Sequence, residues 1–226
     1  MTQLPPRSED TFSKADLRSL LMWVVIGTVG LAVYLGVHKY AFPQAAVNLT
    51  MERHEAVKQS RAFLEARAFD IAPYRHAVAF SSDWHDEKFL EKEANHEEMV
   101  RLMGEEMPPW SWNVRWFVPH QEEEFTVAYT PDGRLDGFEH VIPEAAEGAS
   151  LDAETARTIA ETFLTQEAGV ELANYKPLEA TQKKYPHRLA HTFKWERLDF
   201  GLKGAKYEVS VTVDGDAVAS YGTGLH

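Results

Sequence analysis

Residues 207–221 read YEVSVTVDGDAVASY, in which apolar and polar side chains alternate up to Asp214-Gly215 and a second, mainly apolar run follows. Such alternation is the period of a strand with one buried face. Asp-Gly between two alternating runs favours a tight hairpin, because the turn needs a positive φ that glycine adopts without strain. The stretch therefore predicts two antiparallel strands joined by a short turn.

The same pattern occurs once earlier in the chain. Residues 125–129 alternate, turn at Thr130-Pro131-Asp132-Gly133 and continue into 135–140. Aromatic and β-branched residues are typical of strands, so we expect a further strand before each hairpin, at 112–116 and at 192–197. The chain thus carries two similar sets of strands.

A helical pattern precedes each set of strands. In the second set the pattern follows Asp152, a suitable N-cap, and its apolar residues have the spacing of one buried helix face. These residues are Ala156, Ile159, Ala160, Phe163 and Leu164. The positions 100 residues earlier hold Ala56, Gln59, Ser60, Phe63 and Leu64, of which three are identical. We expect an extended segment after each helix, at 76–80 and at 176–180.

The sequence therefore predicts an α+β fold in which a helix on a short antiparallel sheet occurs twice in tandem. We place the first unit at 47–144 and the second at 150–226, with a linker at 143–150. The first unit carries an insertion at 83–107, in which a broken apolar stripe among Glu and Lys predicts one or two surface helices. Pro108-Pro109 ends the insertion.

Before these units lies an uncharged stretch, residues 19–37, with ten Leu, Val or Ile side chains. As a helix it spans about 28 Å, close to the roughly 30 Å hydrocarbon core of a bilayer. A cleaved signal peptide has a shorter apolar core and a small-residue cleavage site, which are not evident here. We therefore expect a transmembrane helix at 19–40, after a cytoplasmic tail at 1–18.

The flanking charges predict the orientation of this span. Arg7, Lys14 and Arg18 precede it, whereas only Lys39 follows it closely. Basic residues favour the cytoplasmic side, so the N-terminus is expected in the cytoplasm and the C-terminal region outside it. In a bacterium, the chain would be a single-pass protein of the inner membrane with a periplasmic domain.

Two features are candidate protein contacts. Thr28, Ala32 and Gly36 are spaced four apart and form a small-residue stripe, which lets another membrane helix approach closely. The ordinary composition of a span explains this stripe equally well. Trp110 stands beside the double proline and is a candidate for a contact face, although aromatic strand residues most often pack in a core. The expected partners are the lipid bilayer, through residues 19–40, and other membrane-protein helices or subunits.

Composition narrows the classes of function. The net charge is −12 and cysteine is absent. An acidic surface repels phosphate backbones, so nucleic-acid binding is not expected. Without cysteine, the chain forms no disulfide and has no thiolate nucleophile or ligand. No phosphate-binding glycine loop or nucleophile elbow is evident, and we expect no cofactor.

Histidines and carboxylates suggest metal ligands at two places, the charged insertion and the segment before the second aromatic strand. The candidates are His85, Asp86, His96, Glu97, His187 and His191. The last two are four apart, the spacing of two ligands on one helix face, but a proline precedes them and a strand follows. Histidines among carboxylates are usually solvated. We therefore expect neither a metal site nor a catalytic residue.

Five short stretches carry a resemblance to a known family. They are Ala62-Phe63-Leu64, Trp112-x-x-Arg115-Trp116-Phe117, Glu123-Glu124-Phe125, Asp132-Gly133-Arg134-Leu135-x-Gly137-Phe138-Glu139-His140 and His191-Thr192-Phe193-x-Trp195-Glu196. A helix, an aromatic strand and an Asp-Gly hairpin are similar to the PepSY-type modules found outside bacterial membranes. The stretches resemble the extracytoplasmic N-terminal region of large intramembrane metalloproteases of the CAAX-protease and bacteriocin-processing (CPBP) family. The resemblance covers roughly Val47 to Tyr221.

The resemblance implies that the family's catalytic residues lie on later membrane helices, in a Glu-Glu-x-x-x-Arg motif and two His-bearing motifs. Glu97-Glu98-Met99-Val100-Arg101 is one residue too short for the first motif, and Glu122-Glu123-Glu124 has no Arg at the required spacing. A second apolar span is not evident in the sequence. No catalytic residue is therefore carried over from the family.

Three hypotheses of function remain open. The first is a membrane-anchored, noncatalytic sensor or protein-binding module associated with an intramembrane protease. The second is a single-span accessory subunit of a larger membrane complex. The third is a membrane-tethered hydrolase, and scattered His and Glu residues are the only support for it.

Overall fold

The computed structural model describes residues 13–41, 47, 49–178 and 180–226. Most of the predicted tail at 1–18, and Glu179 in the expected extended segment at 176–180, lie outside the described residues. The chain divides into two compact units, 1–46 and 47–226.

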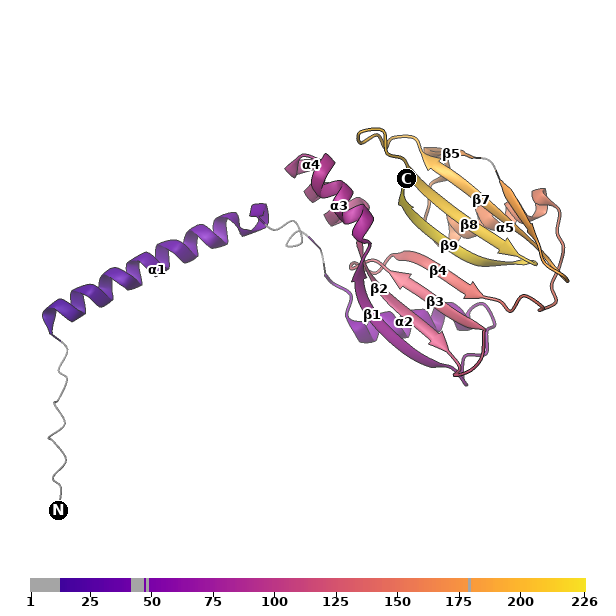
Figure 1. Cartoon of the computed structure of the whole chain (residues 1–226), viewed down its shortest axis with the longest axis horizontal. Helices are drawn as coiled ribbons and strands as arrows, with labels where there is room; N and C mark the ends of the chain where they lie inside the picture. The colour runs from indigo at the N-terminus through magenta and orange to yellow at the C-terminus, as the bar shows by residue number, and fades with distance from the viewer. Residues whose placement is uncertain (1–12, 42–46, 48, 179) are drawn as a thin grey trace, which may run out of the picture. The chain divides into compact units, whose positions relative to one another are not determined.

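The first unit holds helix α1, Lys14–Ala41 (Figure 1). Residues 14–37 are long and apolar enough to cross a membrane, and none of the span's most apolar stretch is buried. Ser13 caps the helix, because its hydroxyl accepts the Asp16 N–H at 3.2 Å while the Asp16 carboxylate accepts the Ser13 N–H at 3.0 Å. The predicted apolar helix near the N-terminus is confirmed.

The second unit is built on an antiparallel sheet, so the predicted mixture of helix and antiparallel sheet is also confirmed. Its described residues form nine strands in the order β1-β2-β3-β4-β9-β8-β7-β5, with β6 pairing β7 as well. The strands are β1 (Arg75–Ser82), β2 (Trp110–Phe117), β3 (Glu124–Tyr129), β4 (Leu135–Val141), β5 (Tyr175–Pro177), β6 (Thr181–Lys184), β7 (Leu189–Arg197), β8 (Tyr207–Asp214) and β9 (Ala217–Leu225). Both predicted hairpins are present, as β3–β4 and β8–β9.

The two halves of this unit share one sheet, which the sequence did not predict. Their last strands, β4 and β9, pair antiparallel through Gly137–Glu139 and Ser220–Gly222. An unpaired last strand in each half would expose a row of backbone N–H and C=O groups, so pairing removes two open edges. Figure 1 shows β4 and β9 side by side in the middle of the sheet.

One helix from each half covers the sheet. Helix α2 (Arg53–Glu65) packs on β2 and β3, and α5 (Ala153–Gln166) packs on β7, β8 and β9. Asp152 caps α5 as predicted, accepting the N–H groups of Glu154 and Thr155 at 3.1 and 2.9 Å. The buried residues of α5 are Ala156, Ala160, Phe163 and Leu164.

Both helices lie on the same face of the sheet and share one apolar core. The guanidinium carbon of Arg67, which follows α2, lies 3.4 Å from the ring centroid of Phe63 and 5.5 Å from that of Phe163 in α5. The core is continuous from Val114 and Trp116 in β2 to Phe193 and Trp195 in β7. The aromatic strands therefore pack mainly in the core, as the sequence favoured.

The insertion after β1 forms a second, smaller apolar cluster. It contains α3 (Trp84–Glu93), α4 (His96–Arg101) and a π-helical turn at Leu102–Glu106. Its buried residues are Leu90, Met99, Leu102, Met103 and Met107, which pack with Leu202 of the second half. The sequence predicted one or two helices here, and the structure has two, α3 and α4. Their apolar stripe is covered by the other half, which the prediction of surface helices did not include.

The segment at 143–150, predicted as a linker, is bound to the second half by Arg188. This side chain is buried; its Nε donates to Asp214 at 2.8 Å and its Nη1 donates to the carbonyls of Pro143, Glu144 and Ala146 at 2.9 to 3.0 Å. A buried arginine is tolerated here because each of its three nitrogens donates to an acceptor, Nη2 to the Ile142 carbonyl at 3.4 Å. No local pattern around Arg188 indicates this contact.

Candidate functional site

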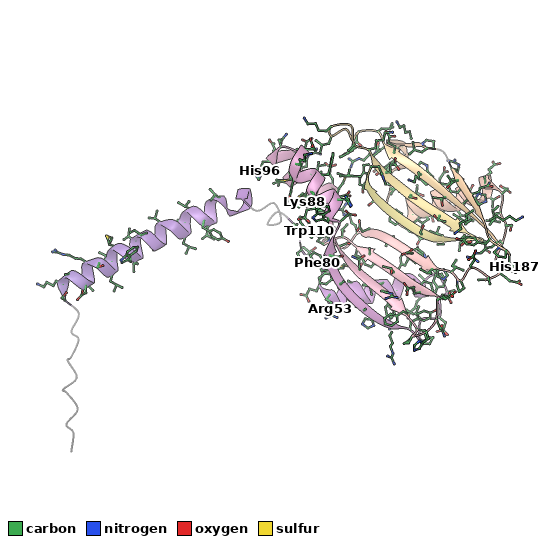
Figure 2. The ribbon with its side chains drawn as sticks, viewed as in Figure 1. Arg53, Phe80, Lys88, His96, Trp110 and His187 are labelled. Carbon is green, nitrogen blue, oxygen red and sulfur yellow. The ribbon has the colours of Figure 1, made fainter. Side chains whose placement is uncertain are left out.

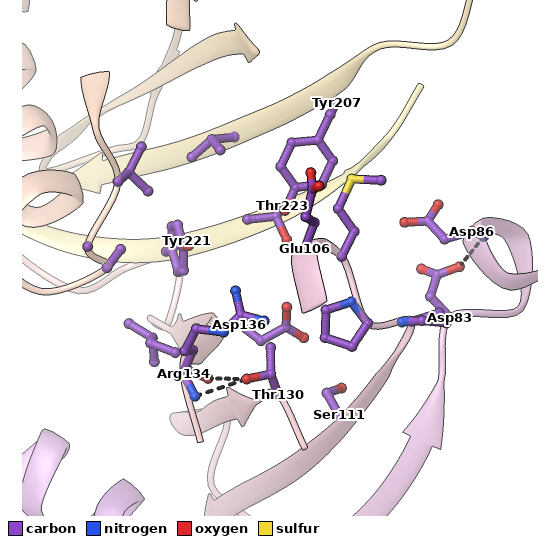
Figure 3. A pocket seen from close by; sticks show the side chains of 18 of the residues that line it. Asp83, Asp86, Glu106, Ser111, Thr130, Arg134, Asp136, Tyr207, Tyr221 and Thr223 are labelled. Carbon is purple, nitrogen blue, oxygen red and sulfur yellow. Dashed lines mark hydrogen bonds between the residues drawn. The ribbon is translucent and has the colours of Figure 1, made fainter. Parts of the chain in front are cut away.

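The strands β4 and β9 diverge beyond Gly137 and Gly222, because their pairing ends there. The space between them is a cleft of about 640 Å³ (Figure 3). Its walls are the start of β4, the end of β9 with the start of β8, the loop after α5 at 168–171, and the two ends of the insertion. The cleft therefore takes residues from both halves of the second unit.

The insertion closes one side of this cleft by binding the second half. The Leu225 N–H in β9 donates to the Asp86 carboxylate at 3.4 Å, and Arg197 in β7 pairs with Glu106 at 3.1 Å. The apolar cluster around Leu90 and Leu202 supports these polar contacts. The insertion thus encloses a space that the diverging strands alone would leave open.

The lining of the cleft is predominantly acidic. It includes the carboxylates of Asp83, Asp86, Glu106, Asp136 and Glu171 and the guanidinium groups of Arg134 and Arg197. Two of the acids have structural roles: Asp83 caps α3 and Glu106 pairs with Arg197. Asp86 accepts the Leu225 N–H, and Asp136 accepts a hydrogen bond from Ser111.

Burial perturbs two of these acids. It raises the pKa of Asp136 to about 6, an effect that Arg134 opposes and Asp86 reinforces. Burial also raises the pKa of Asp86 to about 6, with a further contribution from Asp83. Figure 3 shows Asp136 between Arg134 and the segment that carries Asp83. A positive charge placed in the cleft would favour the ionised form of both carboxylates.

Tyrosine side chains of β5, β8 and β9 also line the cleft. Tyr221 is only 6% exposed, and its ring packs edge-on against Phe163 with centroids 5.3 Å apart. Burial raises the pKa of its hydroxyl, and the nearby Tyr207 and Asp136 raise it further. The Tyr221 hydroxyl therefore lies close enough to Asp136 to interact with it electrostatically. Among the described residues, no hydrogen bond to the Tyr221 hydroxyl is found, whereas the Tyr207 hydroxyl bonds Thr223.

The predicted protein-contact residues lie elsewhere. Thr28, Ala32 and Gly36 are exposed on α1, where the Thr28 hydroxyl donates to the Val24 carbonyl at 2.8 Å. A contact with another membrane helix stays a prediction. Trp110 begins β2, is half-buried and packs on the second apolar cluster, which agrees with a packing role.

The metal candidates are not brought together. Figure 2 shows His96 and His187 at opposite ends of the second unit. The helix that would align His187 with His191 is not formed: His187 lies in a bend and His191 in β7, where its Nε2 is 2.9 Å from the Leu151 carbonyl oxygen. In the described part of the chain, no group of three or more His, Asp or Glu side chains could hold a metal ion.

Sequence reasoning missed the cleft, although it named one of its residues, Asp86, as a metal candidate. A signal was present at Asp136, an acidic residue that interrupts the second strand of the first hairpin. It lies where the β3–β4 register shifts, opposite Ala128 and Tyr129. Such bulges redirect side chains and are frequent beside functional sites.

No protein-family model, curated protein or solved structure matches this chain. The resemblance to PepSY-type modules and to the CPBP family therefore stays a prediction. The geometry of the cleft is the basis for a functional proposal.

Proposed function

We propose that this chain is a membrane-anchored, noncatalytic binding module in which α1 holds the second unit at a membrane and the cleft binds a ligand. The observation that carries the proposal is the 640 Å³ cleft at the divergence of β4 and β9, enclosed by the insertion. Ligand sites in proteins commonly have volumes of roughly 300–1,000 Å³ and lie between structural subunits or domains.

The chemistry of the cleft supports binding over a purely structural role. Burying carboxylates and hydroxyls without strong partners costs stability, so a region selected only for stability would be filled with apolar side chains. Here Asp86 and Asp136 are desolvated enough to raise their pKa values, and the Tyr221 hydroxyl is open to the cleft. Groups of this kind are frequent at functional sites.

The sheet order supports a further part of the proposal, that the two halves are tandem PepSY-like units. Each half runs from a helix to antiparallel strands and ends on the strand that pairs with its counterpart, β4 with β9. We propose that this module regulates or positions a partner for an intramembrane protease of a bacterial inner membrane. The N-terminus would be cytoplasmic and the cleft extracytoplasmic.

The orientation can be tested with single cysteines, because the chain has none of its own. Ser13→Cys and Ser150→Cys lie on the two sides of α1 in sequence, and both positions are exposed. In intact cells, a membrane-impermeant maleimide should label Ser150→Cys and should reach Ser13→Cys only after lysis. The reverse pattern would overturn the orientation, and labelling of both in intact cells would overturn the span.

Ligand binding can be tested with the full chain in lipid nanodiscs. We expect at least one member of a panel of amines, amino acids, dicarboxylates, sugars and short peptides to bind saturably and to slow hydrogen exchange at 221–225. Filling the cleft with Thr223→Trp or Asn174→Trp should abolish binding, whereas Thr181→Trp, on an exposed strand away from the cleft, should not. Saturable binding that survives both cleft variants, or no binding across the panel, would overturn the proposal.

A second candidate, an accessory subunit of a larger membrane complex, is favoured by the exposed small-residue stripe of α1. Thr28→Leu with Gly36→Leu should then release the chain from co-purifying membrane subunits, while the cleft variants should not. Retention of those subunits by the stripe variant would count against this candidate.

A further inference from the structure

We infer that the cleft recognises an organic cation, an alkylammonium or guanidinium group, through the carboxylates of Asp136 and Asp86 and the hydroxyl of Tyr221. This inference rests on the proposed ligand-binding function and names the chemical class of the ligand. The group can belong to a free amine or to a Lys or Arg side chain of a peptide.

The balance of charge favours a cation. Five carboxylates and two guanidinium groups line the cleft. The Arg197 guanidinium is already engaged by Glu106 and Asp199, and Arg134 is paired with Asp132 outside the cleft. Each arginine is thus shared with other carboxylates. Arg134 also favours the ionised form of Asp136, but the carboxylates of the lining still outnumber its guanidinium groups. An anionic ligand would meet an excess of like charge in a partly desolvated space, where charges interact more strongly than in water.

Tyr221 is a separate observation that points to a ligand donor. Its side chain is 6% exposed, lines the cleft and has no hydrogen-bond partner among the described residues. This hydroxyl faces the cleft, so its phenolic oxygen is available to accept a hydrogen bond from a ligand. An ammonium or guanidinium N–H can donate to the phenolic oxygen while its charge faces Asp136.

Aromatic rings complete a site for a cation. Tyr175 and Tyr207 line the same cleft as Tyr221, and both have hydroxyl pKa values raised primarily by burial. Aromatic faces attract organic cations, and they do so more strongly where water is excluded. A guanidinium or alkylammonium ligand can contact these rings, whereas a strongly hydrated metal ion gains little from them.

The backbone of β9 favours a peptide as the source of the cation. Lys206 and His226 exchange hydrogen bonds, so the Leu225 N–H points away from β8, and it reaches Asp86. Residues two apart on a strand direct their backbone groups to the same side. The backbone N–H and C=O of Thr223 therefore also point away from β8. The pairing with β4 stops at Gly222, and the described part of β4 offers Thr223 no strand partner. Thr223 can therefore hydrogen-bond an extended peptide.

The test uses the full chain in nanodiscs and four probes measured by calorimetry. The probes are N-acetyl-Gly-Arg-Gly-amide, the same peptide with citrulline in place of arginine, agmatine and glutarate. Citrulline keeps the shape of arginine and removes its charge. We expect both cations to bind, the citrulline peptide to bind at least tenfold more weakly and glutarate not to bind. Tenfold tighter binding of the arginine peptide than of agmatine identifies a peptide ligand, and equal binding identifies a free amine.

Two variants connect the result to the named residues. Asp136→Asn should weaken binding of the arginine peptide at least tenfold, and Tyr221→Phe should weaken it severalfold. Asp216→Asn, an exposed residue of the β8–β9 turn, is the matched control and should bind as the parent does. Near-ultraviolet circular dichroism establishes that each variant is folded, and Asp86→Asn replaces Asp136→Asn if the latter does not fold.

Three outcomes would overturn this inference and leave the proposed function standing. If a neutral or anionic ligand binds and Thr223→Trp blocks it, the cleft is a ligand site but the inference of a cation is wrong. Equal binding of the arginine and citrulline peptides, or unchanged binding by Asp136→Asn, also overturns the inference. Absence of binding by every probe and by the wider panel overturns both.

Discussion

The junction between the two halves has a paired part and a diverging part, and they differ in chemistry. In the paired part, Phe138 in β4 pairs with Tyr221 in β9, a core residue that also lines the cleft. Phe63 packs edge-on against Phe138 with centroids 5.1 Å apart. Arg67 lies across the rings of both helices and pairs with Glu167. In the diverging part, a few residues away, carboxylates and tyrosine hydroxyls line an open cleft.

This difference shows how one junction can serve both stability and binding. Apolar burial holds the halves together where the strands pair, at about 25 cal/mol per Å² of apolar surface removed from water. Because this part holds the halves together, β4 and β9 can diverge elsewhere and leave polar groups open to a ligand in the cleft. Mutations in the paired part should therefore act on the free energy of unfolding, and mutations in the diverging part should act mainly on binding.

The largest effect is expected from Phe138→Ala in the paired part. Phe138 is 3% exposed, so its truncation leaves a cavity and should lower the free energy of unfolding by about 3–5 kcal/mol. Leu135→Ala, on the same strand but beside the cleft and only half-buried, should cost about 1 kcal/mol. Urea unfolding followed by tryptophan fluorescence measures both. Equal losses would contradict the division of the junction into two parts.

A smaller loss is expected for Arg67→Ala. Burial lowers the pKa of Arg67 to about 10, which shows that its guanidinium is partly desolvated between the helices. Removing its ring contacts and its ion pair should cost about 2 kcal/mol. Arg61→Ala is the matched control. Arg61 also lies over a ring, that of Trp116 at 4.8 Å, but its side chain is 46% exposed, against 17% for Arg67. The same urea titration should show a loss of under about 1 kcal/mol for the control.

The buried carboxylate of Asp136, in the diverging part, should lower the free energy of unfolding at neutral pH. The folded-state pKa of Asp136, about 6, lies above its ordinary value of 3.8, so between these values the folded protein binds more protons than the unfolded chain. Stability should therefore fall as the pH rises from about 4 to 6. Asp136→Asn should remove part of this fall and be about 1 kcal/mol more stable than the parent at pH 7.5.

Asp83, Asp86 and Arg134 also act on Asp136 electrostatically, so the comparison needs a control outside the cleft. Asp216→Asn should leave the pH dependence of unfolding unchanged. If the free energy of unfolding changes with pH in the same way in the parent and in Asp136→Asn, burial does not raise the pKa of Asp136.

The smallest effect is expected from Gly222→Ala, at the point where β4 and β9 begin to diverge. A methyl group there meets no atom within 4 Å, and the substitution restricts the unfolded chain. A gain of about 0.5 kcal/mol is expected, with no change in ligand binding. Gly133→Ala is the opposite case, because Gly133 has a φ of +93° in the first hairpin turn, and it should destabilise. A loss at Gly222 would mean that the divergence tolerates no added side chain.

The sequence by itself determined the local elements of this protein. The spacing of Ala156 to Leu164 predicted α5 and its buried face, Asp152 predicted its cap, and Asp214-Gly215 predicted the β8–β9 turn. The uncharged stretch at 19–37 predicted the apolar helix α1. These features depend on residues within a few positions of one another, which is the range over which periodicity and turn chemistry act.

Only the tertiary structure decided how these elements combine. Three contacts join segments that are 40 or more residues apart. They are the pairing of β4 with β9, the packing of the insertion on Leu202, and the hydrogen bonds from Arg188 to residues 143–146. Asp136 and Tyr221, from different halves, face one cleft for the same reason. Local sequence patterns carry no register between distant strands, because that register is set by how both apolar faces share a single core. The candidate site therefore became visible only once the two halves were joined.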